Sequence, residues 1–176
     1  MITTTDTPVT ILPTGSVHTL SILVNNEPGV LMRICQVFSR RAFNIDSLVV
    51  SQGRDPRFSR MTIGISGDST RLNQIIMQVG KLIDVIHCFE HTSIESVTKE
   101  MVLIKILCKT EERSAALQIT EHFAGKTVDL TPSSMVVMIT GNTAKIDAAV
   151  AMFSQYEIIE TVRTGKVVMA RGELAT

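Results

Sequence analysis

The segment NNEPGVL, Asn25 to Leu31, joins an apolar run typical of a strand to an apolar run typical of a helix. Pro28 suits the first turn of a helix, where its missing N–H is not needed, and the amide of Asn25 or Asn26 can cap that turn. Gly29 fits less well, because glycine within a helical turn is about 0.5–1 kcal/mol less favourable than alanine. Close approach of another group would explain the glycine. Since a helix N-terminus without a Cβ in the way attracts anions, the segment predicts a site for a small carboxylate, with further contacts from Asn26.

Two other motifs resemble ligand sites, but their spacing argues against that function. In HCFEH, His87 and His91 would lie one turn apart on a helix, but about 13 Å apart on the strand that the pattern predicts. No second cluster completes a metal site. In AGKTVD, residues 124–129, a phosphate loop would require glycine where Thr120 stands, and it would precede a helix instead of following one. We therefore expect structural roles here, with no metal site.

The sequence contains no motif that groups a nucleophile with a base. G-x-S-x-G, H-E-x-x-H and G-x-G-x-x-G are all absent from the sequence. The cysteines, Cys35, Cys88 and Cys108, are widely spaced and form no C-x-x-C, which indicates free thiols in a reducing compartment. We therefore expect no catalytic residues, and a binding or regulatory protein.

Composition narrows the class of protein further. The chain has 176 residues, 44% of them hydrophobic, which excludes a disordered chain. Seventeen basic residues balance 17 acidic ones. Arg33, Arg40 and Arg41 are interpreted as a solvated helix face, so no nucleic-acid partner is expected. No apolar run approaches the roughly 20 residues of a membrane span, and residues 1–15 lack the features of a signal peptide. We expect a cytoplasmic protein whose residues 1–15 form a flexible tail.

The elements that must position these residues occur as an internal repeat. In the first unit the sequence pattern predicts strands over 16–24, 43–51, 59–67 and 83–91, and helices over 29–42 and 68–82. The second unit predicts strands over 100–108, 126–132, 133–141 and 157–163 and helices over 110–125 and 142–156. Both have the order βαββαβ, which forms a four-stranded antiparallel sheet with two helices on one face. The fold class is therefore α+β, with two tandem ferredoxin-like domains over residues 16–95 and 96–176.

The second sheet needs more cover than its own helices supply. Residues 135–139, Met-Val-Val-Met-Ile, are apolar on both faces of a strand. We expect the second domain to meet another domain or subunit there. The alternative is that the GKVVMAR tail, residues 165–171, covers this face by itself.

Several of these segments resemble a known family. The run N-x-P-G-V-L followed by S-R-R-x-F-N-I-D-S-L is similar to the ACT domain, a small amino-acid-sensing module with the order βαββαβ. Further runs resemble the regulatory small subunit of acetohydroxyacid synthase, also called acetolactate synthase: RDPRFSRMTI (54–63), KLIDVI (81–86), KEMVLIKI (99–106), VDLTPSS (128–134) and TGKVVMARG (164–172). The resemblance extends from about residue 16 to the last residue.

The resemblance implies a regulatory subunit in branched-chain amino-acid biosynthesis, with no catalytic residues or cofactor of its own. Its partner would be a catalytic large subunit that holds thiamine diphosphate, Mg²⁺ and FAD. The small subunit would activate this partner and confer feedback inhibition by valine or another branched-chain amino acid. The ACT domains would pair into a homodimer by extending their sheets side by side. Asn26, Gly29 and Val30 would receive the effector, with Asn44 and Ile45 supplied by the partner chain.

Two alternatives remain open from the sequence. The chain could be an ACT-type sensor that regulates a different enzyme, although no helix-turn-helix or catalytic domain is visible beside it. It could also be a small metal or redox protein that uses HCFEH and the cysteines.

Overall fold

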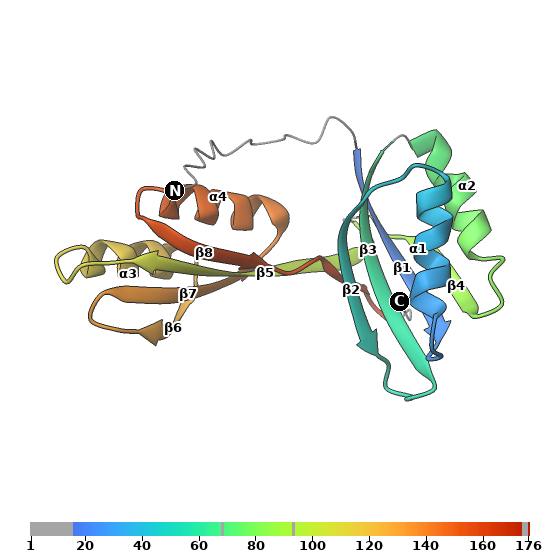
Figure 1. The fold of residues 1–176 in the computed structure, drawn as a ribbon, viewed down its shortest axis with the longest axis horizontal. Coiled ribbons are helices and arrows are strands. Elements are labelled where there is room, and N and C mark those ends of the chain that lie inside the picture. Colours follow the sequence, from blue (N-terminus) through green and yellow to red (C-terminus); the bar gives the residue numbers. More distant parts are fainter. Residues whose placement is uncertain (1–15, 68, 93, 174–175) are drawn as a thin grey trace, which may run out of the picture.

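The computed structural model describes residues 16–67, 69–92, 94–173 and 176. The tail predicted over residues 1–15 lies outside the described residues. Within them, no helix is long and apolar enough to cross a membrane. Figure 1 shows two units, each a sheet with a pair of helices against it.

The first unit has the predicted order. Its elements are β1 (Ser16–Asn25), α1 (Val30–Arg40), β2 (Ile45–Gln52), β3 (Phe58–Gly67), α2 (Ser69–Val79) and β4 (Val85–Glu90). The sheet order is β2-β3-β1-β4, and each pair of neighbouring strands is antiparallel. Strands β2 and β4 therefore form the two edges of this sheet.

The second unit repeats the order and adds one strand. Its elements are β5 (Ser96–Leu107), α3 (Arg113–His122), β6 (Lys126–Leu130), β7 (Ser134–Gly141), α4 (Thr143–Phe153), β8 (Ile158–Arg163) and β9 (Val167–Ala170). The sheet order is β6-β7-β5-β8, and β9 pairs with β5. The predicted fold class is confirmed, but this sheet has five strands instead of four.

Each unit has its own apolar core, formed where the sheet meets its helices. Alternate residues of the central strands face the helices, and apolar residues at helical spacing face back. In the first core, Leu20 and Ile63 of the sheet are fully buried with Ile34 of α1. In the second, Ile104 and Val137 are fully buried with Phe153 of α4. The repeat in the sequence is therefore a repeat of core positions.

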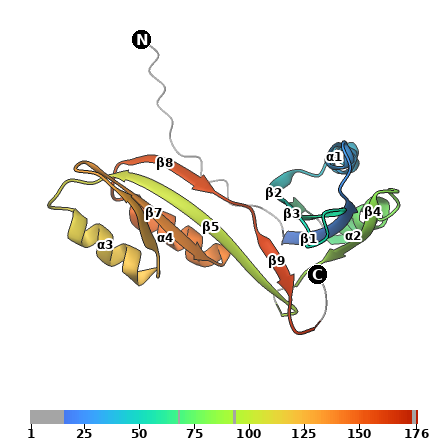
Figure 2. The same cartoon turned by 90° about the horizontal axis from the view of Figure 1, so that it is seen from below.

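Strand β5 is longer than the rest of the second sheet and extends toward the first unit (Figure 2). Its first four residues, Ser96–Lys99, pair with Ala170–Val167 of β9, and its later residues pair with β7 and β8. We call the paired segments 96–99 and 167–170 the β5/β9 arm. Figure 2 shows this arm running from the second sheet toward the first unit. The sequence predicts a strand only from residue 100, so the arm is a finding of the structure.

Thr176 and the β8–β9 connection lie against the helix-free face of the first sheet. The carbonyl oxygen of Thr176 lies 3.4 Å from Nε2 of His87 on β4. A Cβ added to Gly165, in the β8–β9 connection, would lie 3.1 Å from Cβ of Ser47 on β2. Ser21 and Thr62, small polar residues at the centre of that face, are only 0% and 5% exposed.

The second sheet keeps an open face opposite α3 and α4 (Figure 2). Cross-strand pairs place apolar side chains together there, because directly paired residues share a face. These open-face residues are half-buried or exposed: Met101, Leu103, Val136, Met138 and Val162. The alternative that the 165–171 tail covers this face is wrong. Strand β9 pairs edge to edge with the first residues of β5 and lies against the first unit, so it does not pack on the open face.

An ion-pair network around the buried Glu100 joins β5, β8 and α4 near the junction of the two units. Glu100 is 5% exposed, accepts a hydrogen bond from Oγ1 of Thr143 and lies 2.7 Å from Nη2 of Arg163. Arg163 also lies 2.6 Å from Asp147 of α4. These contacts give the buried Glu100 carboxylate hydrogen-bond and charge partners, without which its burial would be strongly destabilising.

Candidate functional site

The segment from Asn25 to Leu31, here the Gly29 turn, links the end of β1 to the start of α1. Gly29 is the N-cap residue of α1, with φ 83° and ψ −7° and no side-chain cap. This left-handed conformation is accessible to glycine and unfavourable for most other residues. The predicted placement of Gly29 and Pro28 within the first helical turn is therefore wrong, since both precede the helix, and the glycine is required by its backbone conformation.

Asn26 holds the turn to the neighbouring hairpin and does not cap the helix as predicted. Its Nδ2 donates to the carbonyl oxygen of Pro56 at 3.0 Å, and its Oδ1 accepts from Oγ of Ser59 at 2.9 Å. The hairpin is stabilised in turn by an ion pair of 2.6 Å between Asp55 and Arg57, and hydrogen bonds from Arg57 hold the pKa of Asp55 below its ordinary value. Both ends of the Asn26 amide thus contact the protein itself.

Arg33 adds a positive charge beside the Gly29 turn. A Cβ at Gly29 would lie 3.2 Å from Nη1 of Arg33, so the guanidinium lies next to the start of α1. Asp84 holds it there through contacts of 2.8 Å to Nε and 2.6 Å to Nη2. The first N–H groups of a helix lack intrahelical acceptors and carry a partial positive charge. The helix start and the Nη1 group of Arg33, which Asp84 does not contact, together offer N–H donors suited to a carboxylate.

The sequence interpretation missed Arg33, which it assigned to a solvated helix face. One signal was available: Arg33 lies four residues after Gly29, and residues at that spacing share one face of a helix. Val30, a predicted effector residue, is 3% exposed and belongs to the core. Its side chain is therefore not accessible, and only its backbone could contribute to a site.

Asn44 and Ile45 lie at the opposite end of α1 from the Gly29 turn. Helix α1 has 11 residues, which corresponds to a length of about 16 Å at 1.5 Å per residue. Nδ2 of Asn44 donates to Asp46 at 3.0 Å, and Ile45 is half-buried against the first core. The structure thus brings Asn26, Gly29 and Val30 together, but does not bring Asn44 or Ile45 to them within one chain.

The cysteines and the HCFEH motif are the groups that the sequence offers for redox or metal chemistry. Burial raises the pKa of the Cys88 thiol to about 12, so at neutral pH it is not the thiolate that nucleophilic chemistry requires. His87 lies on strand β4, as the strand prediction for HCFEH required, and His91 follows the strand directly. Across the described ranges, no three His, Cys, Asp or Glu residues lie close enough to hold a metal ion.

Comparisons with known proteins agree with the two-unit architecture. The family model described as "Small subunit of acetolactate synthase" matches residues 99–172, and the model described as "AHAS small subunit-like ACT domain" matches residues 20–87. The chain belongs to the acetolactate synthase small-subunit family. The resemblance noted from the sequence is therefore confirmed.

Individual relatives extend the match over most of the chain. The acetolactate synthase small subunit of Mycobacterium bovis is 40% identical over 155 residues, covering 88% of this chain and 92% of that protein. That of Haemophilus influenzae is 39% identical over 155 residues, covering 88% and 95%. A crystal structure of the acetolactate synthase small subunit from Thermotoga maritima has a TM-score of 0.82 and 34% identity, covering 90% of this chain and 99% of that one. The chain is thus a small subunit of the acetolactate synthase family, of the regulatory, ACT type. The term small subunit implies a catalytic large subunit as its partner.

Proposed function

We propose that this chain activates its catalytic large subunit and makes it sensitive to inhibition by valine or another branched-chain amino acid. Family membership supplies the partner. The observation that carries the sensing role is the Gly29 turn, where a helix start lies beside the guanidinium of Arg33. In this proposal residues 16–95 bind the effector and dimerise, and residues 96–176 form the second functional domain.

The effector site is completed by a second copy of the chain. Strand β2 is a sheet edge, and α1 lies on the β2 side of the sheet because it connects β1 to β2. Antiparallel pairing of β2 with the same strand of a second copy, about a two-fold axis, would set the two α1 helices side by side in opposite directions. Asn44 of one copy would then face the Gly29 turn of the other. This joins the two groups of predicted effector residues that a single chain keeps apart.

Exposed apolar side chains on β2 support this pairing. Leu48 and Val50 pair with Ile63 and Met61, which face the helices, yet they are 36% and 44% exposed. They lie on the helix side of the edge strand, beyond the cover that α1 supplies. A partner's α1 would cover them, so the same contact that completes the effector site also buries apolar surface.

In this site the effector's carboxylate would meet the helix start and Arg33. The amide of Asn44 from the partner would contact the polar groups at the same end of the effector. Valine would inhibit by binding the inhibited arrangement of the complex more tightly than the active one, and it could shift the equilibrium by no more than that difference in affinity. A coupling of about 1–3 kcal/mol is typical and would give strong feedback.

Reconstitution tests the proposal. The large subunit should form acetolactate faster when this chain is added, and valine should reverse the gain. In Gly29→Asp the activation should remain while the valine response is lost, which separates assembly from sensing. An unchanged rate with no valine response would contradict the proposed function, whereas valine binding without any effect on the large subunit would favour a sensor for a different enzyme.

The proposed dimer is tested separately by light scattering of the isolated chain. Val50→Lys should lower the measured mass toward that of a monomer, because two like charges would meet across the two-fold axis. The matched control is Ile86→Lys on β4, the opposite edge, where the native side chain is 48% exposed. Equal masses for the two variants would rule out pairing through β2.

A further inference from the structure

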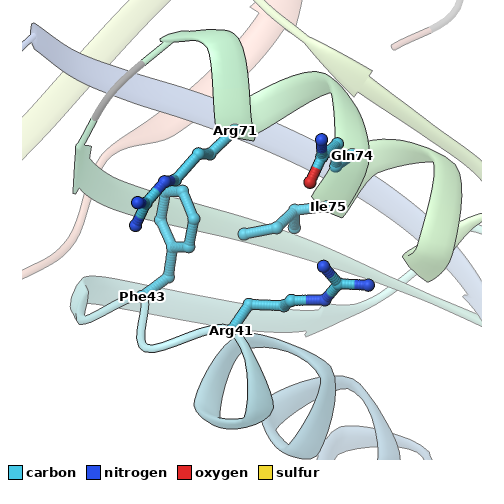
Figure 3. Close-up of a pocket in the computed structure, with 5 residues that line it drawn as sticks. All are labelled: Arg41, Phe43, Arg71, Gln74 and Ile75. Atoms are coloured by element: carbon cyan, nitrogen blue, oxygen red, sulfur yellow. The ribbon is translucent and has the colours of Figure 1, made fainter.

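A second electropositive feature lies at the other end of α1, away from the Gly29 turn. A hollow of about 370 Å³, here the arginine hollow, is lined by Arg41, Phe43, Arg71, Gln74 and Ile75. Its volume falls within the range of about 300–1,000 Å³ found for small-molecule sites. Figure 3 shows Arg41 and Arg71 on opposite sides of it, with Phe43 and Ile75 between them.

The floor of the arginine hollow packs against the first core. Ile75 is 1% exposed and belongs to the first core, and Phe43 packs against that core. A Cβ on Gly67 would lie 2.8 Å from Cε1 of Phe43, so the ring lies directly on the backbone of β3. An apolar, partly aromatic surface is thus fixed between the two cations.

Neither cation is neutralised by a carboxylate of the described residues. Arg33 has a carboxylate partner at 2.6 Å, but in this part of the chain no ion pair includes Arg41 or Arg71. Arg41 is held by a neutral group, with Nε donating to Oε1 of Gln78 at 3.2 Å. Guanidinium groups are weakly hydrated and well suited to oxyanions, so two of them facing one hollow are available to a ligand.

The position of Arg71 strengthens this argument. Arg71 lies in the first turn of α2, which contains no acidic residue, although Asp68 directly precedes the helix in the sequence. A cation there is unfavourable, because the start of a helix already carries a partial positive charge. Arg41, at the end of α1, is by contrast favourably placed. A bound anion beside Arg71 would reduce this repulsion.

We propose that the arginine hollow binds a small organic dianion that has a negative group at each end and an apolar or planar centre. One end contacts Arg41, the other contacts Arg71, and the centre lies on Phe43 and Ile75. None of these lining residues belongs to the proposed effector site, although Phe43 directly precedes Asn44 in the chain.

Calorimetry on the full-length chain at low ionic strength tests this, with terephthalate as the probe. Terephthalate has a carboxylate at each end of a ring, benzoate has one carboxylate, and phenyl phosphate has one dianionic group. Terephthalate should bind at least about tenfold more tightly than benzoate, because a second charge-assisted pair is worth about a factor of ten or more. It should also bind more tightly than phenyl phosphate, and added salt should weaken it.

Variants locate the binding. Arg41→Gln and Arg71→Gln should each weaken terephthalate binding about tenfold. Arg54→Gln, which removes an exposed arginine from the β2–β3 turn, and Gly29→Asp should leave it unchanged. The proposal is overturned if terephthalate does not bind, if it binds no more tightly than benzoate or phenyl phosphate, or if the Arg41 and Arg71 variants match Arg54→Gln.

Discussion

Replacement of Gly29 separates what the backbone requires from what the ligand requires. Gly29→Ala places a Cβ residue at φ 83° and brings that atom to 3.2 Å from Nη1 of Arg33. The left-handed conformation costs about 1–2 kcal/mol for such a residue, while the flexible guanidinium can move aside. For a domain of this size the midpoint of thermal unfolding falls by about 4–8 °C per kcal/mol. Differential scanning calorimetry should therefore detect a clear loss of stability.

Gly29→Asn and Gly29→Asp complete the series. Asparagine and aspartate tolerate the left-handed region better than alanine, so both variants should be more stable than Gly29→Ala. Both nevertheless place a side chain at the helix start, and the aspartate adds a negative charge beside the effector's carboxylate. Valine binding, measured by titration calorimetry, should weaken by about tenfold or more, since a charge-assisted hydrogen bond is worth about 1.5–3 kcal/mol. Wild-type valine affinity in a folded Gly29→Asp protein would refute the proposed site and leave the backbone as the only reason for the glycine.

Three further predictions concern stability. Asn26→Ala removes two hydrogen bonds and should cost about 1–3 kcal/mol in urea unfolding, given roughly 0.5–1.5 kcal/mol for each; a loss below the error of the measurement would mean that water replaces them. Glu100→Gln should cost about 1.5–3 kcal/mol, because Arg163 loses a charged acceptor, and Glu100→Ala should cost more; a neutral result for both would contradict a structural role for the pair. Burial, followed by the charge of Arg60, lowers the pKa of His91 below its ordinary value of 6.5. Protonation therefore favours the unfolded chain, so stability should fall as the pH drops from about 6.5 through the lower folded-state pKa, and His91→Gln should reduce that fall in pH-dependent unfolding.

The sequence predicts the two units well because each builds its core from its own residues. Apolar residues at helical spacing and alternating strand residues identify the elements that contain Ile34, Ile63 and Phe153, and the structure buries all three. The β5/β9 arm was not predicted as a strand pair. Its two short segments, which contain Val97 and Met169, show no alternation of apolar and polar residues that a local pattern would detect. Its stability comes from pairing across about 70 residues of sequence and from the face of the other unit.

The candidate site could be predicted in part. The NNEPGVL segment was identified correctly as a strand-to-helix turn, but the reason for Gly29 depends on a positive φ that the sequence does not specify. The spacing of Arg33 four residues after Gly29 was visible in the sequence, but its contact with Asp84 was not, since that carboxylate is 51 residues away. The role of Asn44 remains a prediction, because it depends on a second copy that one chain cannot describe.

The length of β5 has a mechanical consequence. With 12 residues at about 3.4 Å each, the strand is about 40 Å long. The end that lies against the first unit is paired with β9. A tilt of about 10° at that end would displace the far end by roughly 7 Å over this length. If the first unit turned together with that end of the strand, a small rotation there would become a large movement of the second sheet's open face.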